Sequence, residues 1–132
     1  MTKDTKNTIL IIEDESVQRK PLVDELTDQG YKVLTALNGQ EGLEQAQQAQ
    51  PDLILLDILM PDLDGLSMLK KLREKNAWGK QVPVILLTNL SGNSEEIVKA
   101  VDRDKPAYFL TKADCTLKDI VGKIKEILVR EI

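Results

Sequence analysis

The stretch LILLDILMPDLDG, residues 53–65, decides the fold of this chain. Four apolar residues at 53–56 lead directly into the carboxylate of Asp57, and two more acids, Asp62 and Asp64, follow among proline and glycine. A short apolar run bounded by turn residues is typical of a strand that is buried on both faces. An acid that ends such a strand is either a local turn residue or a chemical group at the edge of a sheet.

Outward from this stretch, the chain alternates short apolar runs with longer amphipathic segments. The apolar runs predict five strands, at residues 9–12, 33–36, 53–56, 84–87 and 107–110. Apolar residues at helical spacing predict five helices, within residues 17–26, 43–49, 66–72, 95–101 and 117–128. Strands that alternate with helices predict an α/β fold, in which a parallel sheet is covered by helices on both faces.

Capping residues and prolines indicate where the predicted helices begin and end. Asp64 can cap the helix at 66–72, and Pro51 should end the helix at 43–49. Pro21 complicates the first helix, because proline has no backbone N–H to donate. That helix either begins late, near Arg19, or bends at the proline.

Composition limits the class of protein. The 132 residues suit one domain, and we expect residues 1–8 to be a flexible lead-in to a single domain at 9–132. The net charge of −4 lacks the basic excess of nucleic-acid-binding proteins, so direct binding to DNA or RNA is not expected. No apolar run approaches the length of a membrane span or a signal segment, which predicts a soluble, cytoplasmic protein without membrane insertion. The chain has no histidine, which excludes histidine catalysis and histidine metal ligands, and its one cysteine cannot form an internal disulfide.

Polar side chains follow four of the five predicted strands, at the point where each strand ends. These residues are Glu13, Asp14, Asp57, Thr88 and Lys112. Because the carboxyl ends of parallel strands meet at one edge of a sheet, we expect these groups to converge. Converging carboxylates repel one another unless a cation joins them, and Mg²⁺ prefers oxygen ligands of this kind. A carboxylate can also attack phosphorus and form an aspartyl-phosphate.

Each of these residues also has an ordinary structural interpretation when it is taken alone. Glu13 and Asp14 could cap the first helix, Thr88 could cap a later one, and Lys112 could be a solvated surface lysine. Their shared place at the same end of successive strands is what favours the chemical interpretation.

The same residues resemble the receiver domain of bacterial two-component response regulators. The resemblance covers about residues 7–130 and rests on four motifs in order, which are IIEDE at 11–15, DILMPDLDG at 57–65, VILLTNL at 84–90 and YFLTKAD at 108–114. It implies a doubly wound, flavodoxin-like sheet of five parallel strands in the order 2-1-3-4-5.

The resemblance also implies the chemistry of the acidic residues. Asp57 would accept a phosphoryl group from a phosphohistidine on a sensor histidine kinase or a histidine phosphotransfer protein. Asp14, Asp57 and the backbone carbonyl of Leu59 would hold Mg²⁺, and Glu13 would act through metal-bound water.

The remaining implied roles concern the switch. Lys112 would pair with the phosphoryl oxygens, Thr88 would hydrogen-bond one of them, and Phe109 would turn inward when Thr88 moves. This coupling would change a partner-binding surface formed by the helix at 95–101, the strand at 107–110 and the helix at 117–128. The alternative for Phe109 is a fixed core aromatic. Ala113 stands where the family usually has a proline after a cis bond, so the isomer of the bond before Ala113 stays open.

We therefore interpret the chain as a Mg²⁺-dependent phosphorylation switch and not as a turnover enzyme. One alternative is an interaction module that keeps the receiver fold without phosphorylation. Another is an Mg²⁺-dependent phosphatase, which often has a second acid where Leu59 stands here. The cognate kinase, the output partner, a phosphorylation-dependent homodimer and an origin within a longer protein are left open.

Overall fold

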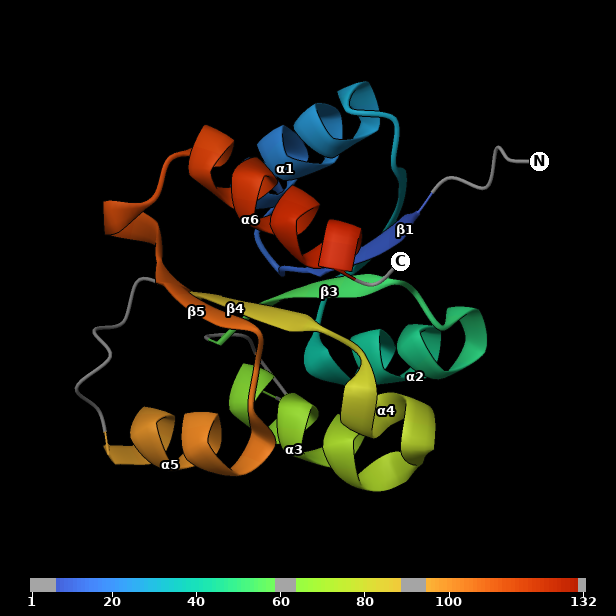
Figure 1. Ribbon diagram of the computed structural model, residues 1–132, viewed down its shortest axis with the longest axis vertical. Helices are drawn as coiled ribbons and strands as arrows, with labels where there is room; N and C mark the ends of the chain where they lie inside the picture. The colour runs from blue at the N-terminus through green and yellow to red at the C-terminus, as the bar shows by residue number, and fades with distance from the viewer. Residues whose placement is uncertain (1–6, 59–63, 89–94, 131–132) are drawn as a thin grey trace.

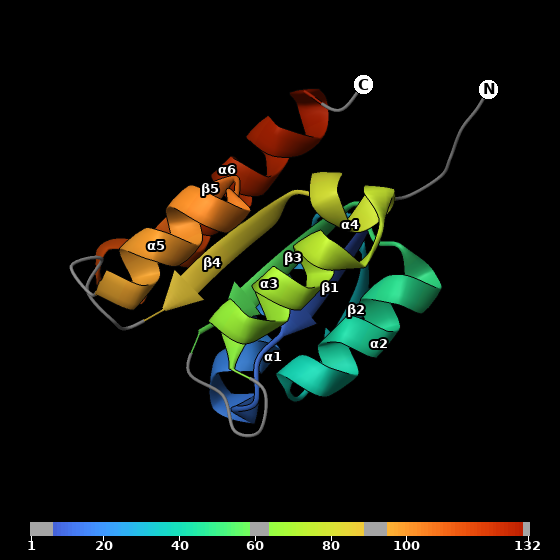
Figure 2. The same ribbon diagram turned by 90° about the horizontal axis from the view of Figure 1, so that it is seen from below.

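Five parallel strands form one sheet in the order β2-β1-β3-β4-β5 (Figure 1, Figure 2). The computed structural model describes residues 7–58, 64–88 and 95–130. The strands are β1 (Thr8–Ile12), β2 (Lys32–Ala36), β3 (Leu53–Asp57), β4 (Val84–Thr88) and β5 (Tyr108–Thr111). The predicted α/β fold and its strand order are therefore confirmed.

Helices cover both faces of the sheet, as predicted. One face carries α1 (Ser16–Asp28) and α6 (Leu117–Arg130). The other carries α2 (Gly39–Ala49), α3 (Gly65–Lys75), α4 (Ala77–Gln81) and α5 (Glu95–Asp104). Figure 2 shows this second layer in front of the sheet. A short 3-10 turn, η1 (Lys112–Asp114), joins β5 to α6. No helix within the described ranges is long and apolar enough to cross a membrane.

The core is divided by the sheet into two clusters, because successive side chains of a strand point to opposite faces. In β1, Leu10 and Ile12 belong to the cluster under α2–α5, whereas Ile9 and Ile11 belong to the cluster under α1 and α6. The three inner strands are almost entirely buried, which explains their continuous apolar sequences. The edge strands β2 and β5 are mostly half-buried.

The first helix differs from one of its two predicted forms. It begins at Ser16, before Arg19, and continues through Pro21, so the late start is wrong. Pro21 removes one backbone donor, but it lies on the exposed side of the helix. Burial of Leu22 and Leu26 against the sheet holds the remaining helix in place.

The short helix α4 was not predicted. Its five residues span little more than one turn, which is too short for an apolar periodicity to be read from the sequence. The side chain of Asn76 caps it by accepting a hydrogen bond from the backbone N–H of Gly79 at 2.7 Å. Trp78 packs against the core cluster under α2–α5.

Close approach of backbone positions the start of α3 beneath the end of β3. Asp64 caps the helix as predicted, because its carboxylate accepts from the N–H of Ser67 at 2.8 Å. Gly65 donates its N–H to the carbonyl oxygen of Ile58 at 2.9 Å. A Cβ atom at Gly65 would lie 2.2 Å from the carbonyl oxygen of Asp57, so only glycine fits here.

Candidate functional site

Three carboxylates meet at the carboxyl end of the sheet. Glu13 and Asp14 directly follow β1, and Asp57 is the last residue of β3. One oxygen from each of the three side chains lies within 4.8 Å of the others. Glu13 is 2% exposed and Asp57 is 7% exposed, so their mutual repulsion is little screened by water.

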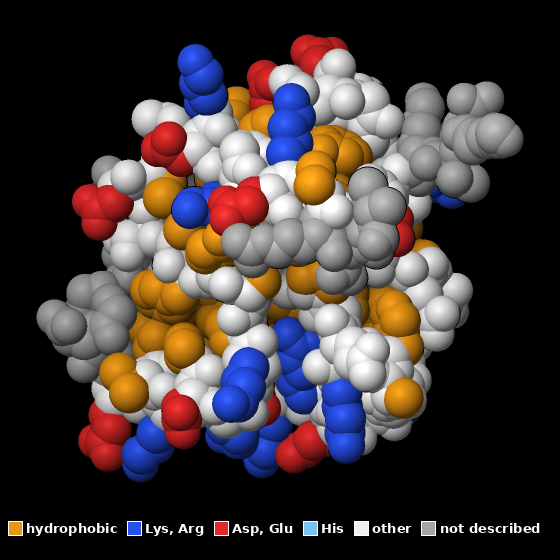
Figure 3. Space-filling view, in the orientation of Figure 1, with side chains coloured by type: hydrophobic (Ala, Val, Ile, Leu, Met, Phe, Trp, Pro, Cys, Tyr) orange, Lys and Arg blue, Asp and Glu red, His pale blue; other side chains and the backbone are white. Residues whose placement is uncertain are grey.

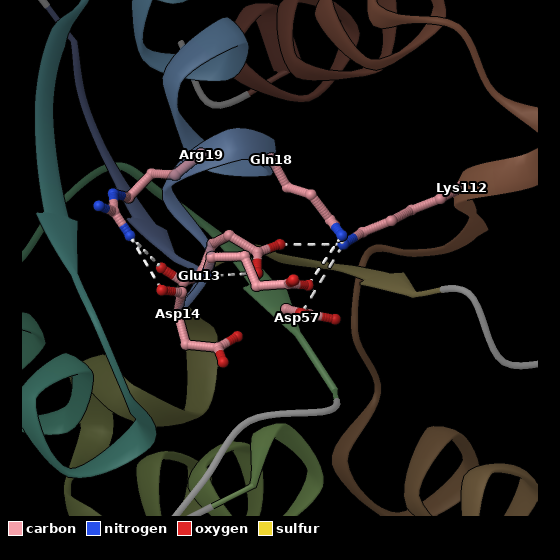
Figure 4. Close-up of polar contacts among 7 residues, drawn as sticks. Glu13, Asp14, Gln18, Arg19, Asp57 and Lys112 are labelled. Carbon is pink, nitrogen blue, oxygen red and sulfur yellow. Dashed lines mark hydrogen bonds and ion pairs between the residues drawn. The ribbon is translucent and has the colours of Figure 1, made fainter.

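Lys112, the first residue of η1 directly after β5, brings a positive charge to these acids. Its Nζ lies 2.9 Å from Oε1 of Glu13 and 3.7 Å from Oδ2 of Asp57. The ammonium also donates a hydrogen bond to Oε1 of Gln18 on α1. Figure 4 shows the lysine side chain reaching across the sheet edge toward these groups. The side chain is 18% exposed, so this lysine is not the solvated surface residue of the ordinary interpretation.

Hydrogen bonds to α1 and β2 fix the backbone of the acid pair. The N–H of Glu13 donates to the carbonyl oxygen of Ala36 at 3.1 Å, which extends the pairing of β1 with β2. Nη1 of Arg19 donates to the carbonyl oxygen of Glu13 at 2.8 Å and to that of Asp14 at 3.4 Å. Oε2 of Glu13 accepts from the N–H of Glu15 at 3.2 Å.

Two residues of this site, Gln18 and Arg19, were missed in the sequence. Both lie in the first turns of α1, which the structure starts at Ser16. A helix that began near Arg19 would have left Gln18 in a loop. The spacing of four to six residues after the acid pair was the available signal, because one helical turn returns the chain to the same edge.

Thr88 and Phe109 lie on the same face of the sheet. Thr88 ends β4 and is fully buried, and it pairs in register with Thr111 of β5. Phe109 pairs with Leu86, which precedes Thr88 by two residues. Leu86 and the half-buried Phe109 both pack in the cluster under α2–α5. Because side chains two residues apart share a face, Thr88 also points to this side.

The donor set fits a small hard cation. Three carboxylates with oxygens this close together are the ligands that Mg²⁺ takes, usually with water completing its shell. Leu59, whose carbonyl is expected to join them, lies outside the described residues. The Lys112–Ala113 bond is trans, and no peptide bond within the described ranges is cis.

A family model described as response regulator receiver domain matches residues 9–125. Among curated proteins, the chain is 35% identical over 125 residues to a protein-glutamate methylesterase/protein-glutamine glutaminase of Archaeoglobus fulgidus, covering 94% of this chain and 34% of that protein. It is 31% identical over 125 residues to the transcriptional regulatory protein AfsQ1 of Streptomyces coelicolor, covering 95% of this chain and 50% of that protein. The chain thus spans half or less of the length of these two relatives.

Solved structures of similar proteins also superpose on this chain. The chemotaxis protein CheY4 of Vibrio cholerae superposes with a TM-score of 0.82 at 26% identity, covering 93% of this chain and 99% of that one. A receiver domain protein of Methanospirillum hungatei superposes with a TM-score of 0.85 at 25% identity, covering 96% of each chain.

Proposed function

This chain belongs to the response regulator receiver domain family, and we propose that it acts as a phosphorylation-driven switch in cytoplasmic two-component signalling. Residues 9–132 would form a single receiver domain. The observation that supports this proposal most directly is the buried Asp57, which faces the ammonium of Lys112 beside the acid pair Glu13 and Asp14. That arrangement combines a nucleophile, a fixed cation and an oxygen-rich cation site.

The proposed step is transfer of a phosphoryl group to Asp57. A carboxylate oxygen of Asp57 attacks the phosphorus of a phosphohistidine on a sensor histidine kinase or a histidine phosphotransfer protein. The new P–O bond forms as the P–N bond breaks, and the electron pair of that bond stays on the imidazole nitrogen. Lys112 lies close enough to pair with the phosphoryl oxygens, since its Nζ is already 3.7 Å from Oδ2 of Asp57.

The acids would hold Mg²⁺ during this step. Asp14 and Asp57 would bind the ion directly, together with the carbonyl of Leu59, and Glu13 would act through bound water. Glu13 suits the indirect role, because its two oxygens already accept from Lys112 and from the N–H of Glu15. When bound, the ion would offset the negative charge of the phosphoryl oxygens.

Phosphorylation would change the surface through Thr88 and Phe109. A phosphoryl group adds about two negative charges beside the acids and offers new hydrogen-bond acceptors. If the hydroxyl of Thr88 turns toward it, room opens on the face that Phe109 shares. The half-buried Phe109 would then move inward and shift an equilibrium between two surface states.

The surface that would respond lies over α5, β5 and α6. Figure 3 shows apolar side chains gathered between α5 and α6, in the region of β5. Val98 on α5 is 54% exposed, and Tyr108, Phe109 and Leu110 of β5 are half-buried. We propose that a downstream protein, or a second copy of the chain, binds this surface after phosphorylation. Gel filtration with and without beryllium fluoride and Mg²⁺ would reveal the homodimer.

The test of the function compares Asp57, the last residue of β3, with Asp52, which directly precedes the strand. We expect wild-type protein to gain one phosphoryl group by mass spectrometry when it is incubated with acetyl phosphate and Mg²⁺. Asp57→Asn should abolish the gain, because the amide is a poor nucleophile. Asp52→Asn is the matched control, since Asp52 is exposed at the other end of the same strand and should leave the gain unchanged.

Other results would favour the alternatives. If the wild type shows no mass gain, the result would favour an interaction module that works without phosphorylation. Sustained release of phosphate from a phosphate ester would identify a phosphatase and contradict our proposal that the chain is not a turnover enzyme. A mass gain that persists in Asp57→Asn would place the acceptor elsewhere.

A further inference from the structure

The ammonium group of Lys112 contacts side chains from three separate elements. It donates to Oε1 of Glu13 after β1 and to Oε1 of Gln18 on α1, and it lies 3.7 Å from Oδ2 of Asp57 on β3. An ammonium has three N–H donors. Two of them are therefore directed to Glu13 and Gln18, which leaves the third for Asp57.

From this geometry we propose that Gln18 is a positioning residue, which orients Lys112 so that one ammonium N–H faces Asp57 and the phosphoryl group it accepts. This inference rests on the proposed function, because it assigns Gln18 a part in phosphoryl transfer. Gln18 acts only through the lysine.

The orientation of the Gln18 amide is set by a second hydrogen bond. Its Nε2 donates to Oε1 of Glu15 at 2.9 Å, so its carbonyl oxygen is the atom turned toward Lys112. The reverse orientation would place an NH₂ group against an ammonium and a carbonyl oxygen against a carboxylate, and both contacts would be repulsive. Glu15 is the N-cap residue of α1, so this anchor belongs to the start of the helix.

Lys112 needs such an anchor because there is free space beside it. A cavity of about 280 Å³ borders Glu13, Gln18 and Lys112. Its other walls are the side chains of Pro21, Leu22, Leu87, Cys115, Leu117 and Ile120. A lysine has a flexible four-carbon stem, and these walls are mostly apolar, with the sulfur of Cys115 as a weak acceptor. The contact with Gln18 therefore restricts where the charge can lie.

The central test replaces Gln18 with a side chain of similar length that has no carbonyl oxygen. We expect Gln18→Met to slow phosphoryl uptake from acetyl phosphate, at saturating Mg²⁺, by about tenfold, because a hydrogen bond to a charged group is lost. Gln29→Met is the matched control, since Nε2 of Gln29 donates to Oε2 of Glu25 at 2.9 Å next to the other end of α1. Uptake by Gln29→Met should equal that of the wild type.

A double-mutant cycle separates positioning from a general structural effect. In a Lys112→Ala background, Gln18→Met should change the rate by less than about twofold, because the group it positions is gone. The affinity for Mg²⁺, measured by calorimetry, should stay within about twofold in Gln18→Met if the acid cluster is intact.

A readout without phosphoryl transfer completes the experiment. Nitrogen-15 NMR of the lysine side chains should show faster exchange of the Lys112 ammonium protons with water in Gln18→Met, and no change in Gln29→Met. Wild-type rate and exchange in Gln18→Met would overturn the inference, as would an equal slowing in the Lys112→Ala background. If the wild type takes up no phosphoryl group, the proposed function fails, and the ammonium exchange still decides whether Gln18 holds Lys112.

Discussion

The two ends of the sheet each hold a cation, and they use it differently. At the amino end, Arg73 donates to the carbonyl oxygens of Gly79 at 2.9 Å and Val82 at 2.6 Å. Further bonds run from Arg73 to the backbone oxygens of Asp104 and Lys105. Burial lowers the pKa of its guanidinium, although the charge of Asp104 opposes the shift. At the carboxyl end, Lys112 faces carboxylates.

The size of a cavity does not locate the chemistry in this protein. A hollow of about 670 Å³ lies at the amino end, and its walls include Tyr31, Trp78 and Lys125. The carboxyl end has a smaller one of about 280 Å³. Only the carboxyl end, within the described ranges, brings three acids together. A cation among backbone carbonyls stabilises a junction, whereas a cation beside a carboxylate could pair with the oxygens of a phosphoryl group that the carboxylate accepts.

The largest expected effect separates the two cations. Lys112→Ala should slow phosphoryl uptake by about 100- to 1,000-fold, because it removes a donor aimed at the developing charge. Arg73→Met should leave uptake within about twofold, but should lower the free energy of unfolding by about 2–3 kcal/mol as carbonyls lose a charged donor. Acetyl phosphate kinetics and urea unfolding measure the two quantities. The distinction between the two ends breaks if Arg73→Met slows uptake as strongly as Lys112→Ala.

Alanine at either of two glycines, one at each end of the sheet, should have an effect of intermediate size. A Cβ at Gly65 would lie 2.2 Å from the carbonyl oxygen of Asp57, and one at Gly79 would lie 2.1 Å from that of Leu72. Each alanine variant should lose about 2 kcal/mol of unfolding free energy, because backbone atoms must shift. Only Gly65→Ala should also slow phosphoryl uptake, by about tenfold, since it displaces the acceptor.

Gly122→Ala in α6 is the control for replacing a glycine by alanine where the added Cβ has free space. A Cβ there has nothing within 4 Å, so Gly122→Ala should raise the free energy of unfolding by up to about 1 kcal/mol. Equal slowing of uptake in Gly79→Ala and Gly65→Ala would show that general destabilisation, and not displacement of Asp57, controls the chemistry.

The smallest effect concerns the helix cap beside the carboxyl end. Asp119 accepts from the backbone N–H of Thr116 at 2.9 Å, and its own N–H donates to Oγ1 of Thr116 at 3.1 Å. Hydrogen bonding from the backbone N–H of Thr116, and then its side chain, lowers the pKa of Asp119 below the ordinary 3.8. The stability it adds is therefore complete above that ordinary value and is lost as pH falls through the lower folded-state pKa.

Asp119→Asn should remove this part of the acid sensitivity. The difference between the melting temperatures of wild type and variant should shrink as pH falls from the ordinary pKa of about 4 through the lower folded-state pKa. A constant difference across that range would show that the charge of Asp119 does not contribute. The Asn76 cap of α4, at the amino end, has no titrating group and should show no such dependence.

Much of the fold could be predicted because its signals are local. Five apolar runs located five strands, and Pro51 and Asp64 marked helix ends that the structure confirms. Pro21 misled the placement of α1, since tertiary burial of Leu22 and Leu26 outweighs one missing backbone hydrogen bond. The helix α4 is too short to produce a periodic pattern.

The candidate site also combines features that the sequence predicts with features that only the tertiary structure decides. The sequence by itself determined which chemical groups end the strands, because parallel strands bring their carboxyl ends to one edge. Tertiary structure alone decided that Gln18 and Arg19 join them, and at what distances. Lys112 contacts Glu13 across 99 positions of sequence and Gln18 across 94. No local pattern carries such a contact, because it depends on how the strands and α1 pack around the same buried acids.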